Sequence, residues 1–170
     1  MLPRVVVTGR TALLSGLLLS CGKPFFNPPP PPLTLEDSHA IPSSLQAIYK
    51  ISVYNGCGML RCPMYSFTLN RDGTAIYEGG TGAPMTGRYI ATIDSSTFSG
   101  FATLLMSSGF FTWTRSKWSC DDCAEGRILV MFDSTGKEVR TGVDPNDSRP
   151  DKLKWALDSA AADLRWASAR

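Results

Sequence analysis

Hydrophobic and polar residues alternate along three segments between residues 49 and 93. Apolar side chains fall at every second position in residues 49–53, 65–69 and 89–93. Successive side chains of a strand point to opposite faces, so a period of two is typical of a strand with one buried face. We therefore predict three half-buried strands, the first of which directs Tyr49 and Ile51 to the core.

Two similar turn sequences indicate hairpins. Residues 70–73 and 133–136 each open with Asn or Asp and place a glycine three positions later. A positive φ carries no Cβ penalty at such a glycine. The first turn leads into a strand over residues 74–78, and the second joins strands over residues 128–132 and 138–143. With the alternating segments, these hairpins give six predicted strands.

A helix is predicted between the fourth and fifth strands. Asp94 or Ser95 can cap its N-terminus, and Gly109 is placed to end it. The apolar residues between them fall on one helical face: Phe98, Phe101, Leu104 and Leu105.

A second helix is predicted to begin near Ser148. Pro150 lies in its first turn, and Asp151 follows the serine by three positions, as in a capping box. A stripe with helical spacing follows, formed by Leu153, Leu157, Ala160, Leu164 and Ala167. Such a stripe is typical of a face packed against a core.

The order of elements is therefore four strands, a helix, two strands and a helix. This order predicts an α+β fold, an antiparallel sheet of about six strands with both helices packed on one face. We assign it to a single domain over residues 48–168, because about 150 residues suffice for one core.

The N-terminal residues indicate export. Arg4 and Arg10 precede a short apolar run over residues 11–20, which is too short to span a bilayer as a helix. The run ends in Leu-Leu-Ser-Cys at residues 18–21, which resembles the bacterial lipobox. The resemblance implies removal of residues 1–20 and acylation of Cys21, palmitate included. An ordinary secretory signal with a chance cysteine is the alternative.

The predicted lipid would attach the chain to a membrane. Gly22 follows Cys21 where, in the lipoprotein pattern, an aspartate would indicate the inner membrane, so the resemblance implies the outer membrane and a periplasmic domain. Residues 21–47 are predicted to be a tether, since the five prolines over residues 28–32 favour an extended polyproline II spacer. A ligand for a proline-recognition module is the competing interpretation.

Charge argues against nucleic acid as a partner. The formal charge of +2 comes from Arg4 and Arg10, and the remaining chain has fifteen basic and fifteen acidic side chains. A neutral chain lacks the basic surface that binds phosphate backbones.

Four domain cysteines, Cys57, Cys62, Cys120 and Cys123, are the candidate reactive or bridging groups. The last two have the Cys-x-x-Cys spacing of thiol oxidoreductases, but the intervening Asp121 and Asp122 oppose thiolate formation. Export favours disulfides, for which four cysteines allow three connectivities. A redox pair or a four-cysteine metal site is the alternative.

Other catalytic sites are excluded by composition. The single histidine, His39, lies in the predicted tether, so the domain by itself cannot assemble a Ser-His-Asp, a Cys-His or a histidine-ligated metal site. We therefore expect a domain without a cofactor, a metal or catalytic residues. An enzyme that uses carboxylates such as Asp121 and Asp122 is the rival hypothesis.

The ordered strands, the Asp72-Gly73 turn and the first cysteine pair resemble a bacterial family known as domain of unknown function 6438, over residues 48–164. The matching positions are Cys57, Cys62, Pro63, Tyr65, Asp72, Gly73, Gly87, Tyr89, Phe110 or Phe111, Gly136, Lys137 and Val139. One extra residue separates the first two cysteines, and Cys120–Cys123 replaces the family's Thr-Asp before the fifth strand.

The resemblance implies the fold but no reaction, because the family has no established activity. It also favours local cysteine pairs, since members carry the first pair without the second. We expect a non-enzymatic binding or envelope-interaction module, with an envelope protein as partner. Its predicted recognition surface includes Trp113, Trp118, Asp121 and Asp122, on loops that support binding in many folds. Burial of the aromatic cluster in the core is the alternative.

Overall fold

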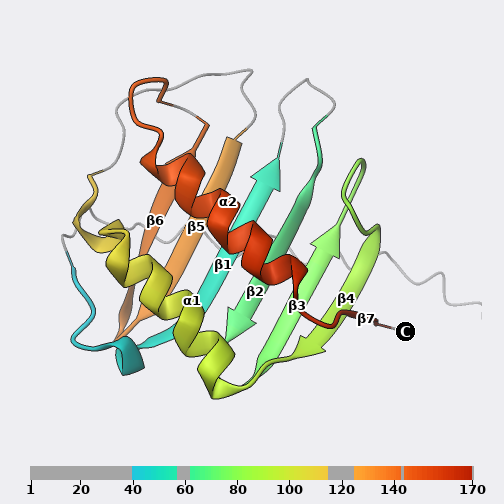
Figure 1. Cartoon of the computed structure of the whole chain (residues 1–170), viewed down its shortest axis with the longest axis horizontal. Helices are drawn as coiled ribbons and strands as arrows, with labels where there is room; N and C mark the ends of the chain where they lie inside the picture. Colours follow the sequence, from blue (N-terminus) through green and yellow to red (C-terminus); the bar gives the residue numbers. More distant parts are fainter. Residues whose placement is uncertain (1–39, 57–61, 115–124, 143, 170) are drawn as a thin grey trace, which may run out of the picture. The chain divides into compact units, whose positions relative to one another are not determined.

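Seven antiparallel strands form one sheet in the computed structural model of the chain, which describes residues 40–56, 62–114, 125–142 and 144–169. Across the sheet the order is β6-β5-β1-β2-β3-β4-β7 (Figure 1). The strands are β1 (Ile48–Gly56), β2 (Tyr65–Asn70), β3 (Thr74–Gly79), β4 (Gly87–Thr92), β5 (Glu125–Phe132), β6 (Thr135–Thr141) and β7 (Ala167–Ser168). The helices are α1 (Ser95–Ser107) and α2 (Arg149–Ala162), with the short 3-10 helices η1 (Leu45–Ala47) and η2 (Phe110–Thr112). The predicted α+β class is confirmed, with one strand more than the sequence indicated.

Strand β1, in the interior of the sheet, joins two parts of the chain that are far apart in sequence. Val53 lies opposite Phe67 of β2 on one side and opposite Ile128 of β5 on the other. Strands β2, β3 and β4 follow one another on the first side, and the β5–β6 hairpin lies on the second. The sheet is thus completed only when residues after α1 pair with β1.

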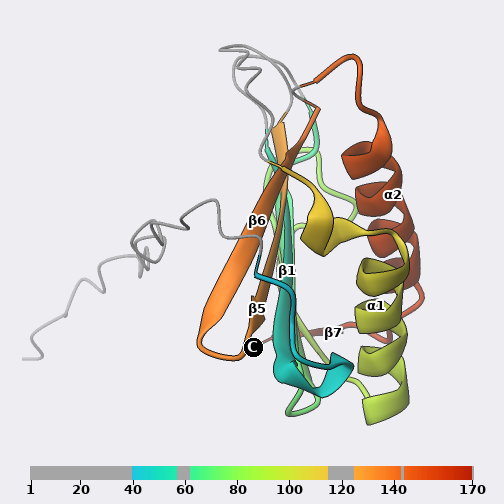
Figure 2. The same cartoon turned by 90° about the vertical axis from the view of Figure 1, so that its left-hand side faces the viewer.

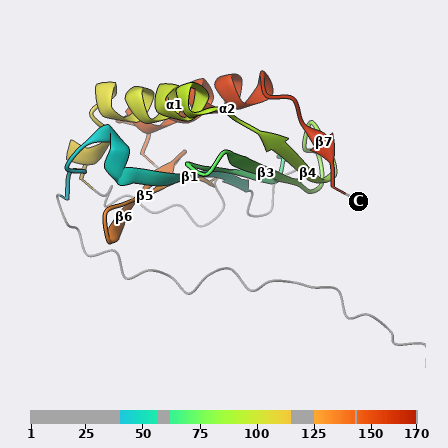
Figure 3. The ribbon, with the colours of Figure 1, turned by 90° about the horizontal axis from the view of Figure 1, so that it is seen from below.

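Both α-helices cover the same face of the sheet (Figures 2 and 3). The core fills the space between them and the sheet, and its largest fully buried side chains are Phe98, Phe110, Phe132, Ile48, Ile51, Leu69, Leu105, Ile128, Leu157, Val53 and Val130. Full burial of one such side chain contributes about 1.5–3 kcal/mol. This burial holds both helices on one face, as predicted.

A β-bulge changes which residues of β1 face the core. Opposite β5, the register shifts between Ile48 and Lys50, so Tyr49 is the extra residue. Ile48 is completely buried, whereas Tyr49 is 42% exposed. The expected inward position of Tyr49 is therefore wrong, because a bulge reverses the alternation of faces at one point.

The two hairpin turns are built differently. In the first, Gly73 has a φ of +93°, and the Asp72 carboxylate accepts the Thr74 backbone N–H at 2.8 Å. In the second, Asp133 takes the positive φ, of +47°. Gly136 instead lies inside β6, where a Cβ would come within 2.6 Å of the Met131 sulfur. The second glycine therefore allows close packing and does not form the turn.

Helix α1 has the predicted ends. Asp94 is its N-cap, and its carboxylate accepts the Thr97 backbone N–H at 2.7 Å. Gly109 follows the helix with a φ of +77°, a conformation that favours glycine. Phe98, Phe101 and Leu105 are buried as expected.

Helix α2 begins and ends differently from the prediction. The Ser148 side chain makes no capping hydrogen bond, and the Asp151 carboxylate accepts the Gly142 backbone N–H at 2.7 Å. The helix ends at Ala162, so the expected stripe is shorter than predicted. Ala167 belongs to β7 and is exposed, because the chain turns back to pair with β4.

The residues just before β1 pack on the domain. Ala40 and Leu45 lie against the core, and the Ser43 hydroxyl donates to the Asp133 carboxylate at 3.2 Å. The Arg71 guanidinium donates to the carbonyls of Leu45 and Ile48, at 2.6 and 2.7 Å. Residues 40–47, which the sequence placed in the tether, therefore belong to the packed structure.

Candidate functional site

The sheet face turned away from α1 and α2 is polar, and no described element covers it (Figure 3). Because side chains alternate along each strand, one half of every alternating pattern points to this side. Its polar and charged residues include Lys50, Ser52, Ser66, Thr68, Asn70, Thr74, Glu78, Arg88, Thr92, Glu125, Arg127, Glu138 and Arg140, and the apolar Ile76 and Ile90 lie among them. We refer to this side as the open face.

A shallow groove of about 220 Å³ crosses strands β1 to β4 on the open face. Its lining residues are Lys50, Ser66, Thr68, Asn70, Ile76, Glu78 and Arg88. Hydroxyl and amide groups thus lie along its middle, with a cation on β1 and another on β4. The groove is smaller than the 300–1,000 Å³ of typical ligand pockets, so it can contact part of a partner but not enclose a large ligand.

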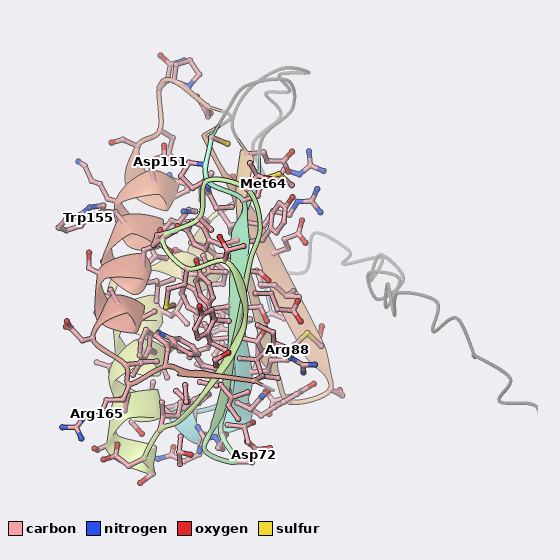
Figure 4. All side chains as sticks on the ribbon, turned by 90° about the vertical axis from the view of Figure 1, so that its right-hand side faces the viewer. Met64, Asp72, Arg88, Asp151, Trp155 and Arg165 are labelled. Atoms are coloured by element: carbon pink, nitrogen blue, oxygen red, sulfur yellow. The ribbon has the colours of Figure 1, made fainter. Side chains whose placement is uncertain are left out.

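The hydrogen-bonding groups of the groove are only partly used within the protein. The hydroxyls of Ser52 and Thr68 lie 3.0 Å apart and share a hydrogen bond. Arg88 points away from the helices (Figure 4) and lies opposite Glu78, with 3.8 Å between Nε and Oε1, and both side chains are well exposed. An exposed ion pair of this length contributes little to stability. These charges can therefore turn towards a polar partner at small cost.

A second charged group lies on β5 and β6 of the same face. The Glu125 carboxylate is 3.0 Å from Arg127 Nε and 3.3 Å from Arg140 Nε. The Arg127 guanidinium also lies over the Tyr54 ring, 5.8 Å from its centroid. One carboxylate thus accepts a hydrogen bond from Arg127 and lies within ion-pair distance of Arg140, whose Nε makes no hydrogen bond among the described residues.

A polar cluster lies on the opposite side of the sheet, between β2 and α2. The Lys154 ammonium donates to Asp158 Oδ2 at 2.7 Å and to the Tyr65 hydroxyl at 3.0 Å. The Tyr65 hydroxyl in turn donates to Asp158 Oδ2 at 2.8 Å. Burial, followed by the hydrogen bond to Asp158, raises the pKa of Tyr65 well above its ordinary value. Tyr65 therefore remains a neutral donor.

The polar cluster fixes α2 against the sheet. Its lysine and aspartate side chains are 11% and 24% exposed, so the ion pair is partly shielded from water. The Tyr65 ring also stacks on Tyr77, with 5.9 Å between the centroids. Asp158 Oδ1 is buried and has no hydrogen-bond partner among the described residues. The cluster contains one positive and one negative charge, and its main effect is to hold α2 against β2.

A buried lysine links β6 to the segment after α1. The Lys137 ammonium donates to the backbone carbonyls of Phe111 and Trp113, at 2.7 and 2.6 Å. Trp113 is only 7% exposed and packs against Phe110, with ring centroids 5.9 Å apart. The expected place of Trp113 on a recognition surface is therefore corrected, because its ring is part of the core.

Most of the other predicted site residues lie outside the described residues. These are Cys21, Cys57, Cys120, Cys123, Trp118, Asp121 and Asp122, together with His39. Cys62 is described and is a disulfide-bonded cysteine, but its candidate partners are not described, so the connectivity stays a prediction.

The described part of the chain contains no group of three or more His, Cys, Asp or Glu side chains placed to hold a metal ion. No helix in the same part is long and apolar enough to cross a bilayer.

The sequence patterns did not predict the cluster of Tyr65, Lys154 and Asp158. Lys154 and Asp158 have the i, i+4 spacing that brings side chains together on a helix. That signal did not show that the pair faces inward, beside the apolar stripe. The position of Tyr65 depends on how the sheet packs on α2, which no local pattern records.

Two comparisons with known proteins bear on identity. The family model described as domain of unknown function (DUF6438) matches residues 49–162, which contain both the groove and the Tyr65, Lys154 and Asp158 cluster. No curated protein matches the chain.

Proposed function

The chain belongs to the family of the domain of unknown function DUF6438, and from its geometry we propose that it is a non-enzymatic binding module of the bacterial envelope. The open face of the sheet carries this proposal. It presents a groove lined by hydroxyl, amide and charged groups on a scaffold that the helices cover from the other side. Binding groups are most effective when rigid elements hold them in place.

The chemistry of the open face favours a polar partner that carries charge. Lys50 and Arg88 supply cations at opposite sides of the groove, and Ser66 and Asn70 supply a hydroxyl and an amide. Complementary charge speeds association and sets the orientation of a partner. We propose an envelope protein as this partner, and not a nucleic acid, because basic and acidic residues are balanced after residue 20.

The N-terminal pattern supports the location. In this proposal, acylated Cys21 anchors the chain to the outer membrane, and the domain faces the periplasm. Replacing Cys21 with Ala is expected to release the protein into the soluble periplasmic fraction. Recovery of the unaltered protein from the cytoplasm would contradict the anchoring.

Binding by the open face is tested by photo-crosslinking in intact cells. A photoreactive residue replaces Thr68 in the groove or, as a control, exposed Ser99 on α1. We expect a specific crosslinked species from position 68 and none from position 99. The same species should be lost when Lys50 and Arg88 are both replaced with Glu, and should persist with Lys152→Glu on the exposed side of α2. Equal crosslinking from both positions would contradict the proposal.

A further inference from the structure

Strand β4 is covered on its outer side by a very short strand. β7 has two residues and pairs with β4 through Ile90↔Ala167 and Tyr89↔Ser168. It lies beside β4 at the end of the sheet, next to the C-terminal end of the described chain (Figure 1). Thr92, at the end of β4, has no strand partner on this side among the described residues.

The backbone groups of β4 that point to this side can be identified. The Ala169 N–H donates to the Arg88 carbonyl at 2.9 Å, so Arg88 directs its backbone groups outward. In an antiparallel sheet the backbone groups of successive residues point to alternate sides. Ile90 and Thr92 therefore also point outward, and these three residues define the β4 edge.

Little besides these backbone contacts holds β7 on the β4 edge. The side chains of Ala167 and Ser168 are both exposed. The residue before β7 is held more firmly, because the Trp166 indole N–H donates to the Ala161 carbonyl of α2 at 2.9 Å. The Trp166 ring lies 5.7 Å from that of Tyr77. β7 can therefore separate from β4 while Trp166 stays packed.

We propose that the β4 edge is a pairing surface for a second copy of this chain, and that β7 closes it. When β7 separates, the two β4 strands pair antiparallel and extend the sheet across a two-fold axis. An unpaired strand edge readily pairs with another chain. A two-fold arrangement pairs the same strand of both copies, because in most homodimers each copy contributes the same surface to the interface.

Side chains on the open face select the register. With Ile90 opposite Ile90 of the second copy, Arg88 lies opposite Thr92 in both directions. Ile90 is 48% exposed in this structure, so the pairing removes apolar surface from water. A register with Arg88 opposite Arg88 of the second copy places like charges face to face, which is destabilising. The favoured dimer is thus centred on Ile90.

The test compares the full chain with the same chain ending at Trp166, by sedimentation at equal concentration. We expect a monomer for the full chain and twice that mass for the shortened chain. In the shortened chain, Ile90→Lys places two cations at the axis and should restore the monomer. Ile76→Lys is the matched control, because Ile76 lies opposite Ile90 on β3, one strand away from the edge, and it should leave the dimer intact.

A second variant keeps all residues, in case the shortened chain fails to fold. By the same alternation, the Ala167 N–H faces Ile90, and Ala167→Pro removes this donor. The full chain with this change should also dimerise, and Ile90→Lys should reverse the effect. A folded chain that stays monomeric after either change would overturn the proposal. So would a dimer that Ile90→Lys leaves intact, or a shortened chain that binds only a foreign peptide.

Discussion

Lys154 Nζ lies 2.7 Å from Asp158 Oδ2, one helical turn later on α2, and both groups also contact the Tyr65 hydroxyl on β2. This ion pair therefore connects the second helix to the start of a central strand. Its energetic effect differs from that of the exposed pair between Arg88 and Glu78, because removing one member leaves a largely buried charge alone.

Replacing Asp158 with Asn should destabilise the domain. The change leaves the Lys154 ammonium without its carboxylate in a site where its side chain is 11% exposed. Breaking a fully buried pair costs about 3–5 kcal/mol, and partial exposure of the aspartate reduces the expected loss to about 1–3 kcal/mol. Urea denaturation measures this loss. Asp163→Asn, at an exposed position just after α2, is the control and should change the free energy of unfolding by less than about 0.5 kcal/mol.

Tyr65 should give the domain a stability loss at alkaline pH. Burial and Asp158 raise the pKa of Tyr65 above its ordinary value of 10.0, so the folded state favours the neutral phenol. The stabilisation that Tyr65 gives the folded state is fully present below a pH of about 10. It is lost as the pH rises further, because the phenol ionises first in the unfolded state.

Between about pH 9 and 11, the free energy of unfolding of the wild type should therefore fall more steeply with pH than that of Tyr65→Phe. Denaturant titrations across this range measure the two slopes. Tyr49→Phe, at the exposed bulge of β1, is the matched control and should follow the wild type. Parallel slopes for all three proteins would contradict a raised pKa at Tyr65.

Asp94 should give a stability loss at acid pH. Hydrogen bonds from the Thr97 backbone and side chain, and from Ser96, lower the pKa of Asp94 from 3.8 to about 2. The stabilisation is present above the unfolded value and disappears as pH falls through the folded one, between about 4 and about 2.

Asp94→Asn keeps a side chain that can cap the helix but removes the negative charge of the carboxylate. Asparagine is also a favourable N-cap, so stability near neutral pH should change little while part of the acid dependence disappears. Thermal unfolding at several pH values compares this variant with the wild type and with Asp163→Asn. An unchanged acid dependence in Asp94→Asn would show that the cap carboxylate is not responsible.

Two tryptophans should respond very differently to truncation. Trp113→Ala empties a core position beside Phe110 and should cost about 3–5 kcal/mol. Trp155 is 72% exposed on α2, and Trp155→Ala should cost less than about 0.5 kcal/mol. Denaturant unfolding of the two variants compares the costs directly. Similar values would mean that Trp113 is not a core residue.

The sequence was sufficient where the physical signal is local. Asp94 and Gly109 bound α1 because a side chain can satisfy helix N–H groups within one turn, and because only glycine adopts a positive φ readily. The strand patterns also gave the polar positions of β2, although they predicted no groove there. These included Thr68 and Asn70, although nothing local showed which strands lie side by side.

Tertiary structure decided what depends on contacts between distant segments. Tyr49 faces outward because β5 imposes a bulge on β1, and Asp151 reaches Gly142 in place of a capping partner. Tyr65 meets Lys154 and Asp158 only once α2 packs on the sheet. Alternation and capping act over one to four residues, and they specify which residues form strands and helices. Strand order, the bulge and the pairing of β7 with β4 arise from burial and backbone hydrogen bonding across the whole domain, which no short segment encodes.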